Sequence, residues 1–166
     1  MTKASQKIAY GTWTSDVSWE FYLTDEIPPR ELCTAVFCLA IHNDDTIVLT
    51  KTKRGWELLG GHLEVGETIE QGMLREAHEE GGYTPETYEL FGCRKIISAK
   101  PIPARDGKIY PHPIGYIPYF IATSSLPLEP THGDKGEIVD SGAFTFAQIK
   151  QMNIGDIELI KAAFQK

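Results

Sequence analysis

The sequence predicts one α/β domain built on a mixed β-sheet, and three observations support this fold class. Apolar runs rich in strand-forming residues recur through the first three quarters of the chain, and segments with helical periodicity lie among and after them. The composition, 42% hydrophobic and 23% charged, is that of an ordinary globular protein. At 166 residues a division would leave two marginal halves, so we expect a single domain over residues 1–166.

The first strands are expected in a short N-terminal segment. Residues 8–14 and 17–24 are two short candidates, and Ile27-Pro28-Pro29 closes them. We interpret residues 1–32 as a β-rich extension of the domain. It exceeds what the remaining core needs and offers a surface for pairing with a second chain, so a homodimer is one expectation.

A central hairpin is expected next. CTAVFCLAIH, residues 33–42, is a nearly continuous apolar run, and the polar Asn43-Asp44-Asp45 separates it from TIVLTK, residues 46–51. Two apolar runs joined by a short polar turn are typical of a hairpin buried in a sheet.

The remaining elements alternate between strands, one long loop and helices. Residues 88–99 and 115–123 are expected strands. Between them KPIPARDGKIYPHP, residues 100–113, is too rich in proline and charge for regular structure, so we expect a functional or mobile loop. TFAQIKQM, residues 145–152, and IGDIELIKAAFQK, residues 154–166, predict two helical pieces.

One helix has well-defined ends in the sequence. Thr68 and Gln71 have the spacing of a capping box, and Gly81-Gly82 is a stop, so a helix is expected between them. On this helix Met73 and Ala77 belong to an apolar stripe that can dock on the sheet.

Acidic residues gather on the neighbouring face of this helix. At about 100° per residue, Glu76, Glu79 and Glu80 share one arc of roughly a hundred degrees. Like charges at these spacings repel, whereas a divalent cation reverses the sign of the interaction. Carboxylate oxygens suit Mg²⁺ or Mn²⁺, and the face lacks the histidine or cysteine that zinc prefers. The alternative is a solvated acidic face with no ligand.

The charge and hydropathy of the chain exclude other classes of function. A net charge of −7 with a pI near 5.2 argues against binding to nucleic acid, which needs a basic surface. The N-terminus lacks the apolar run of a signal peptide, and no stretch approaches the eighteen apolar residues of a membrane span. We therefore expect a cytoplasmic protein without membrane partners.

The frame around the acidic face is far more specific than the face itself. From Gly61 to Tyr83 the sequence satisfies the pattern Gly-x5-Glu-x7-Arg-Glu-u-x-Glu-Glu-x-Gly-u, where u is an apolar or aromatic position. Seven fixed letters at fixed offsets arise by chance in a chain of this length about once in a million. The pattern is the Nudix box, so the chain resembles the Nudix hydrolases. The resemblance implies an α/β/α sandwich around a mixed sheet.

The resemblance also implies a reaction and its residues. Nudix hydrolases cleave the pyrophosphate bond of a nucleoside diphosphate linked to another moiety, with Mg²⁺ or Mn²⁺ held by the glutamates of the box. The positions that match make Glu79 and Glu80 the main metal ligands and Glu76 a further ligand or the base. The carbonyl of Gly60 matches another metal contact, and Glu137 is a candidate for an additional ligand after the box.

Two further positions of the box are implied to act as support. Glu67 and Arg75 match the pair that shapes the loop and the helix without touching the reacting atoms. Arg75 also lies four residues before Glu79, close enough to hold that carboxylate.

Substrate contacts are less sharply indicated. Lys53 and Arg54, just ahead of the box, suit phosphate binding, although an exposed basic hairpin is the simpler interpretation. Trp56 suits stacking on a base or packing in the core. Arg105 in the long loop is a candidate for contacts to the leaving group.

A small nucleotide is therefore the expected partner, and three functions remain open. A (deoxy)nucleoside triphosphate is the first expectation for the substrate, followed by ADP-ribose or another nucleotide sugar. A non-catalytic nucleotide-sensing domain is the second class of function, although such a domain has no need of every metal ligand. Isomerisation of isoprenoid diphosphates is a third.

Overall fold

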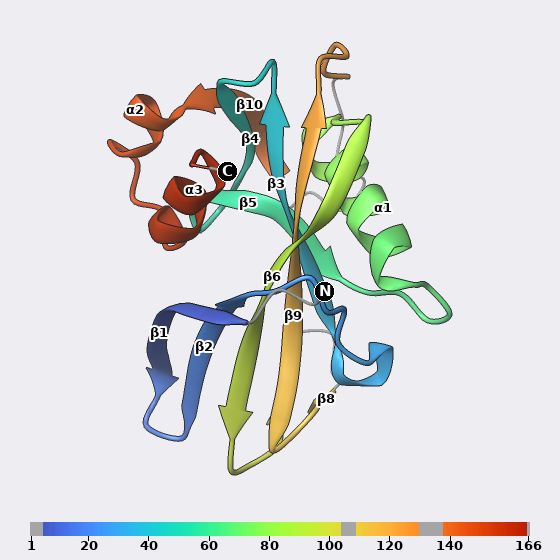
Figure 1. Ribbon diagram of the computed structural model, residues 1–166, viewed down its shortest axis with the longest axis vertical. Coiled ribbons are helices and arrows are strands. Elements are labelled where there is room, and N and C mark those ends of the chain that lie inside the picture. Colours follow the sequence, from blue (N-terminus) through green and yellow to red (C-terminus); the bar gives the residue numbers. More distant parts are fainter. Residues whose placement is uncertain (1–4, 104–108, 130–137, 166) are drawn as a thin grey trace.

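The computed structural model describes residues 5–103, 109–129 and 138–165, and its main feature is one large twisted β-sheet flanked by helices (Figure 1). The sheet has the strand order β1-β2-β6-β9-β3-β5-β4-β10, and β7 and β8 form a separate ribbon. The strands are β1 (Gln6–Thr14), β2 (Val17–Leu23), β3 (Ala35–His42), β4 (Thr46–Thr52), β5 (Gly55–His62), β6 (Thr87–Ser98), β7 (Ile102–Pro103), β8 (Ile109–Tyr110), β9 (Ile114–Ser124) and β10 (Ile138–Thr145). The helices are the 3-10 helix η1 (Arg30–Leu32) and the α-helices α1 (Ile69–Gly81), α2 (Phe146–Ile149) and α3 (Ile157–Ala163).

The sheet is mixed, as the sequence predicts. β3 and β9 run parallel, with Phe37 opposite Tyr119, while the other neighbouring strands of the large sheet are antiparallel. Because α1 covers one face and α3 the other, the arrangement is an α/β/α sandwich (Figure 1). The predicted fold class is therefore confirmed.

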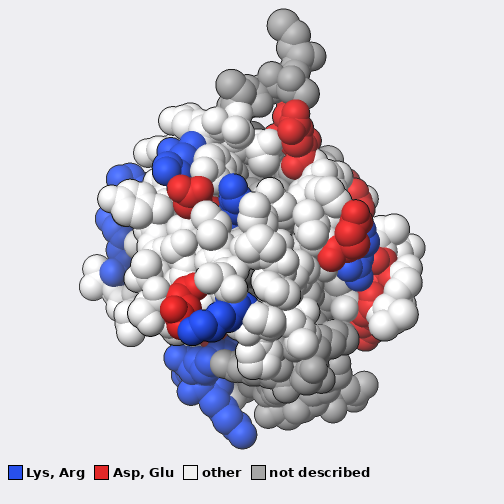
Figure 2. Space-filling model, turned by 90° about the horizontal axis from the view of Figure 1, so that it is seen from below, with Lys and Arg blue, Asp and Glu red and all other residues white. Residues whose placement is uncertain are grey.

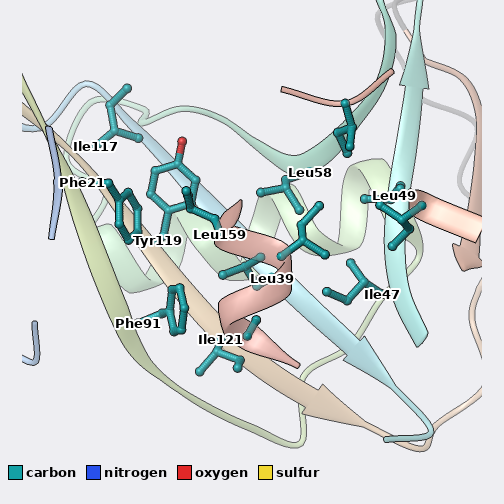
Figure 3. Packing of buried hydrophobic residues seen from close by; sticks show 14 of the residues in the cluster. Phe21, Leu39, Ile47, Leu49, Leu58, Phe91, Ile117, Tyr119, Ile121 and Leu159 are labelled. Carbon is teal, nitrogen blue, oxygen red and sulfur yellow. The ribbon is translucent and has the colours of Figure 1, made fainter. Parts of the chain in front are cut away.

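Two hydrophobic cores lie on opposite faces of the sheet, because successive strand residues point to opposite sides. On one face α1 buries Met73 and Ala77 completely against the strands. On the other face α3 places Leu159 over the side chains of Leu39 and Tyr119 (Figure 3). The helix that carries the acidic residues is thus fixed to the centre of the sheet.

The ends of α1 match the sequence prediction. Thr68 is the N-cap: its hydroxyl accepts from the Gln71 amide at 3.1 Å, and the Gln71 side chain accepts from the Thr68 amide at 2.9 Å. Gly82 ends the helix with φ +57°, a left-handed conformation that favours glycine. A Cβ at Gly82 would also lie 1.4 Å from the carbonyl oxygen of Glu129, so only glycine fits. Both ends fix the rotation of the helix and hence the direction of its carboxylates.

We expect Tyr83→Phe to lower the free energy of unfolding by about 1–2 kcal/mol. Tyr83 is fully buried, and its hydroxyl donates to the carbonyl oxygen of Ile41 at 2.6 Å, which joins the end of the box to β3. The change leaves that acceptor without its donor. Urea denaturation measures the difference, and Tyr10→Phe, at a ring that is 79% exposed, serves as the control. Equal stability of the two variants would contradict this role of the hydroxyl.

The central hairpin differs from the expectation in its pairing. Asn43 and Asp44 form the turn with positive φ, but β3 and β4 pair at only three positions beside it, from Ala40–Val48 to His42–Thr46. Beyond that point β5 lies between the two strands and pairs with both. The double glycine at the end of β5 therefore lies against β3, in the interior of the sheet.

The chain contains more strand than the sequence predicts. β5 and β10 were not expected, and in the segment 100–113 Ile102 pairs with Tyr110 in the short β7–β8 ribbon. The expectation that this whole segment is irregular is therefore wrong at β7 and β8. The C-terminal helical pieces are shorter than expected, with four residues in α2 and seven in α3.

The N-terminal hairpin continues the main sheet, because β2 pairs with β6 along its whole length. β1 is the outer strand, and its register with β2 is interrupted between Lys7 and Ala9 and between Thr12 and Thr14. Such interruptions disfavour the addition of another strand at this edge of the sheet. The homodimer stays a prediction. No helix in the described ranges has the length and apolar character needed to cross a bilayer.

Candidate active site

The double glycine at the end of β5 allows α1 to approach the sheet closely. At Gly61 a Cβ would lie 2.6 Å from a carboxylate oxygen of Glu76, and at Gly60, where φ is +154°, it would lie 2.4 Å from the carbonyl oxygen of Val36. A larger residue at Gly61 would therefore displace the carboxylate of Glu76, and one at Gly60 would displace the neighbouring strand. Gly61 leaves room for a carboxylate directly against the backbone of β5.

Arg75 connects the loop after β5 to the acidic face of α1. Its Nε donates to Glu67 Oε1 at 2.8 Å, and its Nη2 donates to Glu67 Oε2 at 3.1 Å. Its Nη1 donates to Glu76 at 2.8 Å and to Glu79 at 3.1 Å, and its Nη2 also reaches the carbonyl oxygen of His62 at 3.0 Å. One guanidinium thus orders three of the box carboxylates.

The charges in this network shift the ionisation of its members. The hydrogen bond from Arg75 is the main cause that lowers the pKa of Glu67, against the opposing effect of its partial burial. The same bond, followed by bonds to Glu76 and Glu79, raises the pKa of Arg75. The lowered pKa favours the charged form of Glu67, which pairs with Arg75. That this pair supports the site stays a prediction from the box.

Glu80 has a different environment from the other glutamates of the box. Its carboxylate accepts the Gly60 amide at 2.8 Å, and the side chain is partly buried beside β5. Burial raises the pKa of Glu80 to about 8, and the negative charges of Glu76 and Glu57 act in the same direction, whereas the hydrogen bond from Gly60 opposes them. Near neutral pH this carboxyl group holds a proton when no cation is close.

The carboxylates do not form a ready-made ligand cage. Within the described ranges no group of three or more histidine, cysteine, aspartate or glutamate side chains has the geometry of a metal site. Glu76 and Glu79 are bound to Arg75, while Glu80 turns to the backbone of β5. The donor set still fits a hard dication, because carboxylate oxygens line the space beside Gly60 and Gly61 and burial raises the pKa of Glu80, which a nearby cation would reverse.

The structure separates the candidates for substrate contacts. Lys53 is exposed in the turn between β4 and β5, and Arg54 forms two 2.8 Å hydrogen bonds to the carboxylate of Glu57. Trp56 packs edge-on against Phe144, with 4.8 Å between ring centroids, in the core opposite α1. The packing interpretation of Trp56 is thus the one that the structure supports. Arg105 and Glu137 lie outside the described residues.

Sequence reasoning missed two side chains near the site. Glu57 alternates with Leu59 and Gly61 on the face of β5 that meets α1, and its charge acts on Glu80. The His62 ring lies 3.0 Å from the Tyr110 hydroxyl, which joins the long loop to β5. The alternation of side chains along a strand would have placed Glu57 on the face of β5 that meets α1, but β5 was not expected. No local pattern pairs His62 with Tyr110.

A mixed sheet between helices, with a glycine-rich strand end leading into a carboxylate-bearing helix, defines a Nudix-type domain. The chain belongs to the NUDIX family, because the family model described as NUDIX domain matches residues 31–163. The assignment made from the box is confirmed.

Curated relatives resemble parts of the chain. A putative nudix hydrolase 1 from Caenorhabditis elegans is 42% identical over 66 residues, which are 36% of this chain and 18% of that protein. The 8-oxo-dGTP diphosphatase of Escherichia coli (strain K12) is 51% identical over 35 residues, 21% of this chain and 27% of that protein. The ADP-ribose pyrophosphatase of Methanocaldococcus jannaschii is 39% identical over 57 residues, 31% of this chain and 34% of that protein. The matches thus span at most about a third of each relative.

Solved structures share the fold over most of the chain. The pyrophosphohydrolase of Bacillus subtilis superposes with a TM-score of 0.61 at 19% identity, covering 82% of this chain and 77% of that one. The NUDIX domain of Shewanella oneidensis NrtR, solved with ADP ribose, has a TM-score of 0.59 at 17% identity and covers 84% and 89%. At these identities the likeness concerns the fold alone.

Proposed function

We propose that this chain hydrolyses the pyrophosphate bond of a nucleoside diphosphate linked to another moiety, with Mg²⁺ or Mn²⁺ as cofactor. The observation that carries the proposal is the network around Arg75, which holds Glu67, Glu76 and Glu79 in one array beside the partly buried Glu80. An array of carboxylates ordered in this way is costly without a cation and useful with one.

The residues have separate tasks in this proposal. Glu79 and Glu80 hold the cation, and Glu76 acts as a further ligand or as the base. Glu67 and Arg75 keep these carboxylates in place. A cation held by these residues would supply neutralising charge for the phosphates and a lowered pKa for water. Because Glu80 holds a proton near neutral pH, binding of the cation displaces that proton.

The wider ligand set is also a proposal. The carbonyl of Gly60 is a further metal contact, and Glu137 an additional ligand from beyond the box. Lys53 and Arg54 are candidates for phosphate contacts, and Arg105 for contacts to the leaving group. Arg54 has the best support among them. It forms an ion pair with Glu57, and its positive charge acts to lower the pKa of Glu80.

The first substrate class that we propose is a (deoxy)nucleoside triphosphate, and ADP-ribose or another nucleotide sugar is the alternative. The relatives named for 8-oxo-dGTP and for ADP-ribose support one class each. A sensing domain without turnover is disfavoured, because every carboxylate of the box is present.

Cytoplasmic location and the absence of nucleic-acid and membrane partners stay predictions. On the face in Figure 2, basic and acidic side chains are interspersed with uncharged surface.

A substrate screen tests the proposal. Product formation is measured by liquid chromatography over nucleoside triphosphates, nucleotide sugars, dinucleoside polyphosphates and coenzyme A, with Mg²⁺ and with a chelator, because the proposed cleavage gives a nucleoside monophosphate and a second phosphorylated product. We expect turnover of at least one class that disappears with the chelator. Binding of nucleotides without turnover would favour the sensing domain, and turnover that ignores the chelator would contradict the metal-dependent reaction.

A further inference from the structure

The side chain of Arg30 contacts the box loop through three hydrogen bonds. Arg30 lies in η1, ahead of the central strands, and its side chain is partly buried. Nε donates to the carbonyl oxygen of Glu67 at 2.8 Å, Nη2 to that of Glu64 at 3.1 Å and Nη1 to that of Cys33 at 3.0 Å. Each guanidinium nitrogen therefore binds a backbone carbonyl, and two of the three carbonyls belong to the loop between β5 and α1.

Within this loop the Glu64 amide donates to Glu67 Oε2 at 2.8 Å and the Glu67 amide to the carbonyl of Glu64 at 3.3 Å. Among the described residues the centre of the loop has few restraints from the rest of the chain. The Leu63 amide ties its beginning to the carbonyl of Thr34 at 2.9 Å. Its middle contains Val65, which is 96% exposed, and Gly66, with φ +81°. A hollow of about 570 Å³ lies between this part of the loop and the segment that carries Arg30. Packing contributes little across a hollow, so the link between the two segments depends on the guanidinium.

The held carbonyl belongs to the residue that supports the box arginine. Arg30 fixes the main chain of Glu67, while the carboxylate of Glu67 receives two hydrogen bonds from Arg75. Arg75 in turn holds Glu76 and Glu79. Contacts therefore run without interruption from η1 to the proposed metal ligands. Arg30 precedes the matched region 31–163 by one residue, so it lies outside the part of the chain that the family model matches.

We propose that Arg30 is a positioning residue that sets the box loop and, through Glu67 and Arg75, the geometry of the metal-binding carboxylates. The inference rests on the proposed function. A planar guanidinium with several donors suits three separate carbonyls, one at each nitrogen, whereas a lysine ammonium is a compact charge on a flexible stem. Loss of the guanidinium frees the loop and loosens the support of Arg75.

Two variants test the role of the Arg30 guanidinium group. Arg30→Gln removes its charge and most of its donors, and Arg30→Lys keeps the charge. We expect hydrogen exchange in residues 63–68 to become faster in both. We expect Mn²⁺ affinity, measured by electron paramagnetic resonance, to fall about 10–100-fold in Arg30→Gln, as when groups that orient metal ligands are removed. Arg30→Lys should lie closer to Arg30→Gln than to the wild type.

Lys7→Gln is the matched control, because it removes one cation from the ion pair with Glu20 on the N-terminal hairpin. We expect it to keep wild-type exchange and Mn²⁺ affinity. Circular dichroism checks folding, and Arg30→Lys provides the test if Arg30→Gln does not fold. Wild-type exchange in the Arg30 variants, or full rescue by lysine, would overturn the positioning role.

The same measurements distinguish a failure of the proposed function from a failure of the role of Arg30. A wild-type protein that binds no Mn²⁺ would overturn the metal-dependent reaction and this role together. Wild-type binding that stays unchanged in both Arg30 variants would overturn only the role of Arg30. A wild-type kcat with a raised Mg²⁺ requirement in Arg30→Gln would support it, since a merely structural contact would shift melting temperature and not the metal requirement.

Discussion

Glu79→Gln should reduce Mg²⁺-dependent turnover by about a thousandfold while the fold stays intact. A ligand that loses its charge no longer holds the cation against the phosphates, and such stabilisation is worth several kcal/mol. About 4 kcal/mol corresponds to three powers of ten in rate. The side chain of Glu79 is 54% exposed and has one 3.1 Å contact to Arg75, so its loss costs little stability.

The measurement is kcat/KM with the best substrate of the screen, together with a thermal melt and Mn²⁺ binding. Glu70→Gln is the control, since it removes one negative charge from the first turn of the same helix. We expect the control to retain activity within about twofold, as is usual for a surface substitution. Undiminished turnover in Glu79→Gln would exclude Glu79 as a ligand.

The helix of the box was predictable because its determinants are local. The capping pair Thr68 and Gln71 and the left-handed Gly82 fix its ends through contacts within a few residues. The contact between Arg75 and Glu79 follows from their spacing of four on a helix, and the structure has it at 3.1 Å. Local chemistry thus fixes both the element and the first contacts on its surface.

The order of the strands was not predictable by the same means. Neighbouring apolar runs indicate a hairpin, yet β5 separates β3 from β4 beyond three residue pairs. β5 includes Gly60 and Gly61, and glycines lower the strand propensity of a segment. In the folded protein the two glycines allow close approach of the β3 backbone and of the Glu76 carboxylate, and these tertiary contacts leave no local pattern in the sequence.

The carboxylates show the limit of a helical-wheel argument. Sharing an arc predicts that Glu76, Glu79 and Glu80 converge, but each takes the donor nearest to it. Arg75 binds the first two, and the Gly60 amide binds the third. Glu76 and Glu79 thus share one nitrogen of Arg75, whereas Glu80 binds the backbone of β5. Which partner is available depends on β5, and therefore on the part of the fold that the sequence did not predict.

The stability of the metal-free protein should fall as pH rises from about 4.5 to 8. The pKa of Glu80 is raised to about 8, chiefly by burial, whereas an unfolded glutamate has a pKa near 4.5. Below pH 4.5 both states hold the proton and Glu80 has no effect on stability. Between the two values the unfolded chain releases the proton while the folded one keeps it, so unfolding becomes easier. Above about pH 8 the loss is complete.

We expect this loss to be roughly 2–4 kcal/mol, less than the full shift implies because the side chain is only partly buried. Urea denaturation in a chelator at several pH values measures it, and Glu80→Gln, which cannot titrate, should lack this contribution. Glu158→Gln, in α3 on the opposite face, should follow the wild type. Excess Mg²⁺ should remove the loss, because a cation at the ionised carboxylate binds only the folded state. A wild-type curve that coincides with that of Glu80→Gln would show that Glu80 ionises as freely in the folded protein as in water.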